Sequence, residues 1–196
     1  GANMAGWFKQ PLRRLDDLKG VRIRTAGLGG EIYRQLGAAT VTLSPSEIFG
    51  ALQSGAIDAV EFLGPFSDRA LGFNQVADNY YYPGFNKPNG TAEALINANL
   101  WSSLDTDVRA AVQNACDAEN DAGLAEATWF NAQALKALQA EGTNIQALPA
   151  DIIATAQEAA RGVLADFADT NAMTRKVQQS YAQAVASLSA WDGVQS

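Results

Sequence analysis

Short apolar runs separated by turn residues mark the first part of the chain. They predict strands over 21–25, 40–43 and 57–62, with helices over 31–36 and 45–54 between them. Strands and helices that alternate over so few residues are typical of parallel βαβ units, in which helices cover a sheet. The hydrophobic pattern therefore indicates an α/β fold.

The predicted helix over 45–54 has the clearest boundaries in the sequence. Ser44 can cap it, Pro45 suits the first helical position, and Glu47 completes a capping box. Gly55 follows the last apolar position and can end the helix, because glycine adopts the left-handed conformation without strain.

The second part of the chain has the composition of helices. It is rich in alanine, and its one proline is Pro149. The pattern predicts a helix that is capped by Asp105, continues to Glu141 and ends at Gly142. Such a helix spans on the order of 55 Å, more than the width of a small domain. We therefore expect it to bridge two lobes or to pack against a partner.

The remaining segments add further elements. The stretches 91–97 and 143–147 read as strands, and helices are expected over about 150–168 and 171–190. The sequence contains no internal repeat and no low-complexity linker. A chain of 196 residues suits one domain, or two lobes that share one chain.

Composition excludes several kinds of chemistry. The chain has no histidine, which excludes Ser-His-Asp catalysis and histidine-based zinc sites. Cys116 is the only cysteine, so an internal disulfide and a four-cysteine zinc site are excluded. The net charge is −7 without a basic cluster, which disfavours binding to nucleic acid or to an anionic membrane. No apolar run approaches the ~18 residues of a membrane span.

Charged residues end two of the predicted parallel strands. Arg24 lies at the end of the first strand and Glu61 near the end of the third. Ligands of open parallel sheets bind beyond the carboxyl ends of the strands, and a guanidinium can pair with a carboxylate through two hydrogen bonds. Position alone also suits plainer interpretations: a solvated arginine at a strand end, and an ordinary salt bridge for Glu61, with Arg24 as its candidate partner.

Other chemistry-bearing positions give weaker signals. The segment 27–30 is rich in glycine and could receive an anion on backbone N–H groups, but it matches neither the P-loop nor the dinucleotide fingerprint. Lys87 lies in a predicted turn, where a lysine is commonly solvated. The aromatic residues at 7–8 and 80–82 are expected mainly in the core or between lobes.

Five short strings occur in an order and spacing that resemble a known family. They are GWF at 6–8, LKGVRIR at 18–24, GAIDAVE at 55–61, GP at 64–65 and YYYPG at 80–84. This resembles the solute-binding proteins of tripartite ATP-independent periplasmic (TRAP) transporters, the DctP-like family, in the branch that binds 2-oxo acids and other small monocarboxylates. The resemblance covers nearly all of this chain, but only the latter part of the family's chain.

The resemblance implies a type II-like, periplasmic-binding-protein-like fold, with two α/β lobes around a cleft and long helices that span both. Residues 1–61 are then expected to form the core of the second lobe, and 62–100 the crossover strands of the first-lobe or hinge region. Residues 101–196 are expected to supply the spanning helix and the C-terminal helices. Most of the N-terminal lobe and a signal peptide would lie upstream, and the location would be periplasmic.

The resemblance also assigns roles to single residues. Arg24 matches the arginine that clamps the substrate carboxylate, and Asn3 matches an amide that lines the cleft. Glu61 matches an acidic residue that helps to hold a metal ion, and Phe62 replaces a common tryptophan as the aromatic wall. Lys87 stands where metal-binding relatives carry a second acidic residue.

The lysine changes the expectation about a cofactor. A hard cation needs several oxygen ligands, and an ammonium in place of a carboxylate removes one of them and adds positive charge. A sodium or calcium ion that bridges Glu61 and the substrate is therefore the less favoured alternative. The favoured expectation is that Lys87 performs the cation's electrostatic role by pairing with Glu61 and with the ligand's oxygen.

The function that the resemblance implies is capture of a small organic carboxylate and its delivery to the TRAP permease, without catalysis. One alternative is a cytoplasmic effector-sensing domain of a transcription regulator. Another is an enzyme that acts on 2-oxo acids through Lys87, which would then need a lowered pKa. Neither nucleic-acid binding nor membrane insertion is expected. Relatives in this branch dimerise by exchanging a C-terminal helix. The residues 191–196 lie near where that helix would begin, so the exchange is expected to be lost here, and a homodimer is left as an open expectation.

Overall fold

The computed structural model describes residues 2–87, 90 and 93–195, with side chains up to residue 189. Its sheet has six strands in the order β3-β2-β4-β1-β5-β6. The strands are β1 (Gly6–Phe8), β2 (Arg22–Arg24), β3 (Ala39–Val41), β4 (Ala59–Val60), β5 (Asn79–Tyr82) and β6 (Asn144–Ala147). β2 pairs in parallel with β3 and β4, and β5 pairs in parallel with β6. β1 is antiparallel to both β4 and β5, so the other five strands share one direction.

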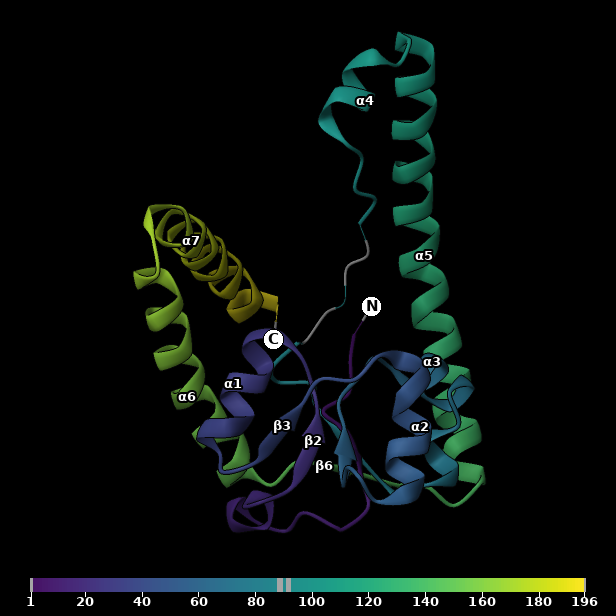
Figure 1. Cartoon of the computed structure of the whole chain (residues 1–196), viewed down its shortest axis with the longest axis vertical. Helices are drawn as coiled ribbons and strands as arrows, with labels where there is room; N and C mark the ends of the chain where they lie inside the picture. Colours follow the sequence, from purple (N-terminus) through teal and green to yellow (C-terminus); the bar gives the residue numbers. More distant parts are fainter. Residues whose placement is uncertain (1, 88–89, 91–92, 196) are drawn as a thin grey trace.

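Helices cover both faces of this sheet, which confirms the α/β expectation (Figure 1). Side chains of α1 and α6 pack on one face, and those of α2, η2 and α5 on the other. The helices are η1 (Leu15–Leu18), α1 (Gly27–Gln35), α2 (Pro45–Ser54), α3 (Pro65–Ala70), η2 (Phe73–Gln75), α4 (Ala98–Ser103), α5 (Thr106–Ala140), α6 (Ala150–Asp169) and α7 (Ala172–Gln195).

Alternating aromatic side chains fill the two layers between sheet and helices. Trp7 lies in one layer, stacked on Tyr80 with ring centroids 4.0 Å apart. Phe8 lies in the other, edge-on to Tyr81 at 5.6 Å. Successive residues of a strand point to opposite faces, so two adjacent aromatic pairs serve both cores. The expectation that the aromatic residues lie mainly in the core is confirmed for these four, whereas Tyr82 is 44% exposed.

The predicted boundaries of α2 are also confirmed. The backbone N–H of Ser44 donates to the Glu47 carboxylate at 2.9 Å, and Pro45 is the first helical residue. Gly55 follows the helix with a φ of 76°, in the left-handed region that favours glycine.

The long helix α5 begins after Asp105 and runs for 35 residues. Its C-terminal end packs against α3 and the sheet, where Leu138 is fully buried. The rest projects away from the sheet, with α4 beside its far end (Figure 1). Apolar side chains such as Leu124 and Trp129 are exposed along it. The long helix predicted after Asp105 is confirmed. Its role in bridging two lobes stays a prediction.

The strand predicted over 91–97 is wrong where the structure can test it. Residues 93–97 form no strand, and residues 91–92 lie outside the described residues. Leu95 is 86% exposed, so this stretch has neither a neighbouring strand nor a core to pack on. Asn97 instead caps α4, with its side-chain oxygen accepting from the N–H groups of Asn99 and Leu100. The expected assignment of 62–100 to a hinge region stays a prediction, although β5, within it, belongs to this sheet.

Two further boundaries differ from the expectation. The first helix begins at Gly27 rather than at residue 31, because the glycine-rich segment forms its first turn. The aromatic run at 80–82 is part of β5, which pairs with β1 and β6. β6 and α6 lie close to their predicted ranges.

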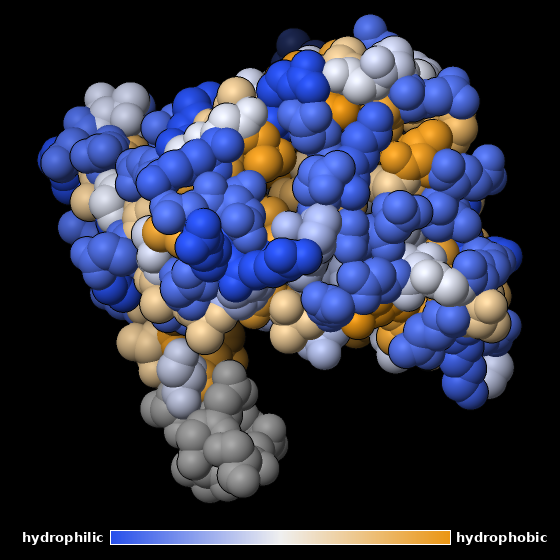
Figure 2. Space-filling view, turned by 90° about the horizontal axis from the view of Figure 1, so that it is seen from below, coloured by the Kyte–Doolittle hydropathy of each residue, from blue (hydrophilic) through white to orange (hydrophobic). Residues whose placement is uncertain are grey.

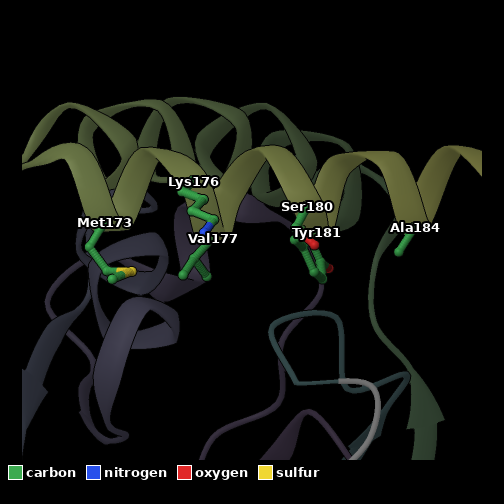
Figure 3. A pocket seen from close by; sticks show the side chains of 6 residues that line it. All are labelled: Met173, Lys176, Val177, Ser180, Tyr181 and Ala184. Atoms are coloured by element: carbon green, nitrogen blue, oxygen red, sulfur yellow. The ribbon is translucent and has the colours of Figure 1, made fainter.

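Helix α7 folds back from α6 and turns one face toward the sheet domain. Figure 3 shows Met173, Val177 and Tyr181 on this face, and these residues help to line an open groove of about 470 Å³. All the residues that line the groove belong to α7, and none is a candidate site residue from the sequence. The side chains from residue 190 onward, where an exchanged helix was expected to begin, lie outside the described part.

The face of the molecule that is seen from below is mostly hydrophilic, with small scattered hydrophobic areas (Figure 2). Within the described residues, none of the helices combines the length and hydropathy that crossing a membrane requires.

Candidate functional site

The topology of the sheet brings all five candidate residues to one edge. Arg24 ends β2, Glu61 and Phe62 follow β4, and Lys87 follows β5. These strands run in one direction, so their carboxyl ends meet at the same edge. β1 runs the opposite way, and Asn3, which precedes it, therefore reaches the same edge.

Arg24 is held at this edge by neutral groups. Its Nε donates to the backbone oxygen of Leu43 at 3.2 Å, and its Nη1 donates to the backbone oxygen of Glu61 at 3.1 Å. The Phe62 ring lies against the guanidinium, with its centroid 5.3 Å from Cζ. Within the described part of the chain, Arg24 forms no ion pair. Its charge and its remaining N–H donors are therefore available to an anion.

Arg22, two residues earlier on the same strand, behaves differently. Its guanidinium binds the Asp58 carboxylate through Nε at 2.8 Å and Nη2 at 2.6 Å. This hydrogen bonding lowers the pKa of Asp58 below its usual value. Arg22 is thus a neutralised surface arginine, whereas Arg24 is positioned but not neutralised.

Glu61 is a buried carboxylate, 2% exposed. Its Oε2 accepts a hydrogen bond from the Thr25 hydroxyl at 3.1 Å. Its Oε1 lies 3.0 Å from the Lys87 ammonium, an ion-pair distance, but accepts no hydrogen bond within the described residues. From the sequence, Arg24 is a candidate salt-bridge partner of Glu61. The structure corrects this, because Arg24 contacts the backbone of Glu61 and Lys87 contacts the carboxylate.

Lys87 joins the site from the segment after β5. Besides facing Glu61, its Nζ donates to the backbone oxygen of Phe62 at 2.8 Å. Its side chain is 40% exposed, against 3% for that of Glu61. The interpretation of Lys87 as an ordinary solvated turn lysine is therefore wrong, since its ammonium covers a buried carboxylate.

Asn3 supplies an amide NH₂ group that has no partner among the described residues. It is nine-tenths buried, and its Nδ2 makes no hydrogen bond within the described residues. The neighbouring backbone is fixed, since the N–H of Met4 donates to the oxygen of Leu63 at 2.9 Å. A buried donor left unpaired costs free energy, so this amide is suited to a ligand oxygen.

Three contributors to the site were assigned no role from the sequence. Thr25 is buried and donates to Glu61. Tyr33 donates to the backbone oxygen of Ala5 at 3.1 Å, and burial together with the Glu61 charge raises its pKa. Asn86 has a buried side-chain oxygen without a partner in the described chain. Proximity to a charged candidate in sequence could have identified Thr25 and Asn86, but nothing local marks Tyr33.

The glycine-rich segment has a packing role. A Cβ on Gly29 would lie 2.5 Å from Nδ2 of Asn86, so this glycine makes room for the segment that carries Lys87.

The residues around Glu61 do not fit a hard metal ion. Its immediate side-chain neighbours are an ammonium and a hydroxyl, and the ammonium lies next to the open oxygen. Within the described residues, no cluster of three or more His, Cys, Asp and Glu side chains is placed to hold a metal. A calcium ion takes six to eight oxygen ligands, which this set does not offer.

The fold is that of bacterial periplasmic solute-binding proteins, as solved structures show. A TRAP transporter solute-binding protein from Bordetella bronchiseptica RB50 matches with a TM-score of 0.95 and 28% identity, over 99% of this chain and 58% of that one. That structure is a mixed-occupancy dimer, in which copurified calcium and picolinate occupy one active site and the other is in the apo state.

The chain belongs to family 7 of the bacterial extracellular solute-binding proteins, the DctP family, whose model matches residues 1–171. This confirms the resemblance stated from the sequence. The family consists of transport proteins rather than enzymes.

Two further relatives indicate the ligands of similar proteins. The monocarboxylate 2-oxoacid-binding periplasmic protein of Nostoc sp. strain PCC 7120 is 34% identical over 194 residues, 99% of this chain and 53% of its own. A TRAP solute-binding protein from Pseudoalteromonas atlantica T6c, with bound sodium and pyruvate, is 30% identical with a TM-score of 0.87, over 97% of this chain and 58% of that one. The chain thus spans little more than half the length of these relatives.

Proposed function

We propose that this chain forms part of the solute-binding subunit of a TRAP transporter, which captures a small monocarboxylate of the 2-oxo acid class at the carboxyl edge of its sheet. The captured acid is then delivered to the membrane permease. The observation that carries this proposal is the state of Arg24, a guanidinium fixed by two backbone oxygens and an aromatic ring and free of any carboxylate partner in the described chain.

Arg24 would bind the carboxylate of the solute. A guanidinium whose orientation is already fixed loses little conformational freedom on binding, so more of the pairing free energy contributes to affinity. Nε and one N–H of Nη1 are engaged by backbone oxygens. The remaining N–H groups of the guanidinium, on Nη1 and Nη2, would therefore meet the ligand.

The charge of the site supports a monoanion. Arg24 and Lys87 are positive and Glu61 is negative, which leaves one unit of positive charge among these side chains. Asn3 adds a neutral donor suited to a second ligand oxygen, such as the carbonyl oxygen of a 2-oxo acid. Phe62 would form the apolar wall beside a short carbon chain.

Catalysis through Lys87 has less support. A Schiff-base lysine needs a free amine, whereas this Nζ already faces the Glu61 carboxylate and donates to a backbone oxygen. Membership of an extracellular transport family also favours a periplasmic protein over a cytoplasmic sensor domain. We include in the proposal a permease partner, and a homodimer like the one seen in the Bordetella relative.

Calorimetric titration of the full-length protein with pyruvate tests the proposal. Removing a positioned charge partner costs at least ~2 kcal/mol, so Arg24→Ala should weaken binding by at least about 30-fold. Arg22→Ala is the matched control, since it removes an arginine from the same strand that is already paired with Asp58. Equal affinities of the Arg24→Ala and Arg22→Ala proteins would contradict the assignment.

A further inference from the structure

We infer that the Lys87 ammonium takes the place of an inorganic cation, so that this site binds its monocarboxylate without sodium or calcium. This inference rests on the proposed function and concerns how the same site achieves it. Relatives from Pseudoalteromonas and from Colwellia psychrerythraea hold pyruvate together with sodium and calcium, respectively.

A buried carboxylate beside an anion-binding site creates an electrostatic problem. Glu61 is nearly inaccessible to water, and its charge would repel an incoming carboxylate at short range. A cation next to Glu61 removes that repulsion and can attract the ligand oxygen as well. A positive group next to Glu61 therefore suits this arrangement.

Lys87 has the geometry for this role. Its Nζ is 3.0 Å from Oε1 of Glu61 and 2.8 Å from the backbone oxygen of Phe62. An ammonium has three donors, so one remains after these two contacts. The side chain is also partly exposed, which leaves this donor accessible to a ligand.

The same geometry opposes a metal ion. The open oxygen of Glu61 already faces the ammonium, and a cation placed there would lie within a few ångströms of another positive charge. The other oxygen of Glu61 accepts from Thr25, and the backbone oxygen of Phe62 accepts from Lys87. Of the oxygens that a cation would need, two thus accept hydrogen bonds from protein donors, and Oε1 of Glu61 is ion-paired with the ammonium.

Calorimetric titration of the full-length protein with pyruvate and a panel of other 2-oxo monocarboxylates tests the inference. One buffer contains EDTA and tetramethylammonium as its only salt cation, and matched buffers contain calcium or sodium. The expected result is the same affinity in all buffers, within about twofold. Binding that requires calcium or sodium overturns the inference and leaves the proposed function standing. Failure to bind any of these acids in every buffer overturns both.

Two variants separate a ligand-binding role of Lys87 from a merely structural one. Lys87→Met removes the charge at similar length and should weaken binding at least tenfold in the cation-free buffer. Lys87→Glu places a second carboxylate beside Glu61 and should bind pyruvate only when calcium is added. Wild-type affinity of Lys87→Met without cations overturns the inference, and so does calcium-independent binding by Lys87→Glu. Thermal unfolding of both variants verifies that they are folded.

Discussion

The guanidinium of Arg24 lies against the ring of Phe62, with Cζ 5.3 Å from the ring centroid. Phe62 is itself fixed, since its ring meets Phe73 edge-on at 6.0 Å. The orientation of the arginine thus depends, through Phe62, on Phe73. Phe73 is buried and lies outside the proposed contact with the ligand. A change in the hydrophobic core could therefore be transmitted to the charged group.

Replacing Phe62 by leucine should weaken pyruvate binding between about twofold and tenfold. A cation–π contact at a partly exposed site contributes about 0.5–1 kcal/mol, and the shorter side chain also loses part of the apolar wall. Phe62→Trp should retain most of the affinity. Phe49→Leu, a half-buried phenylalanine of α2 next to Gly72, is the control for the general loss of an aromatic ring. Calorimetry on the four proteins decides, and an effect of Phe49→Leu as large as that of Phe62→Leu would count against this role.

Replacing Asn3 by aspartate should weaken binding at least tenfold. The change keeps the shape of the side chain but exchanges its unpaired N–H donor for a negative charge, which would meet the ligand oxygen. Asn120→Asp on the exposed part of α5 makes the same chemical change away from the site. Calorimetric affinities of both variants test this, and an unchanged affinity of Asn3→Asp would remove Asn3 from the site.

Much of the sheet could be predicted because its elements are specified locally. The capping box at Ser44 and the left-handed Gly55 fix both ends of α2 within a few residues. The strand ending in Arg24 alternates buried and accessible positions, as a strand with one face in the core does. The segment 91–97 could not be predicted in the same way, since a short apolar run becomes a strand only where a neighbouring strand can pair with it.

The site residues could be predicted in part, but their pairing could not. The end of a parallel strand is a local feature, which is why Arg24 and Glu61 were identifiable. Whether Glu61 pairs with Arg24 or with Lys87 depends on how the segment after β5 returns across the edge of the sheet. That path is set by contacts distant in sequence, such as the one between Gly29 and Asn86.

Replacing Gly29 by alanine should impair binding through that path. The added Cβ would lie 2.5 Å from Nδ2 and 3.3 Å from Cβ of Asn86, so Asn86 must move, and Lys87 follows it in sequence. We expect pyruvate affinity to fall several-fold. Gly50→Ala is the matched control, because nothing lies within 4 Å of its Cβ and alanine favours a helix by about 1 kcal/mol. Urea unfolding and calorimetry of both variants check this, and equal affinities would show that Asn86 moves without consequence for the site.

The buried carboxyl of Asp68 should make stability depend on pH in an unusual direction. Its oxygens accept from the Trp7 indole at 3.1 Å, the Tyr80 hydroxyl at 2.8 Å and the Leu63 N–H at 3.1 Å. These donors favour the ionised form, but burial has the larger effect and raises the pKa of Asp68 to about 6. In the unfolded chain an aspartate titrates near ~3.9.

Between these two values the folded protein retains a proton that the unfolded chain has released. The contribution of Asp68 to the free energy of unfolding is therefore largest below about pH 4. It falls by roughly 3 kcal/mol as the pH rises through 6, and is constant above that. Surface carboxylates with lowered pKa values, such as Asp58 and Glu141, act in the opposite sense at lower pH, so the whole protein does not isolate the effect.

Comparison with Asp68→Asn isolates it, because the amide does not titrate. Urea unfolding of both proteins between pH 4 and 8 gives the difference in free energy of unfolding, wild type minus variant. This difference should decrease by a few kcal/mol between pH 4 and about 7 and then remain level. A difference that is constant, or that increases with pH, would mean that the three donors outweigh burial and that Asp68 is ionised throughout this range. In that case the carboxylate would act as a fixed acceptor that holds Trp7 and Tyr80 in place.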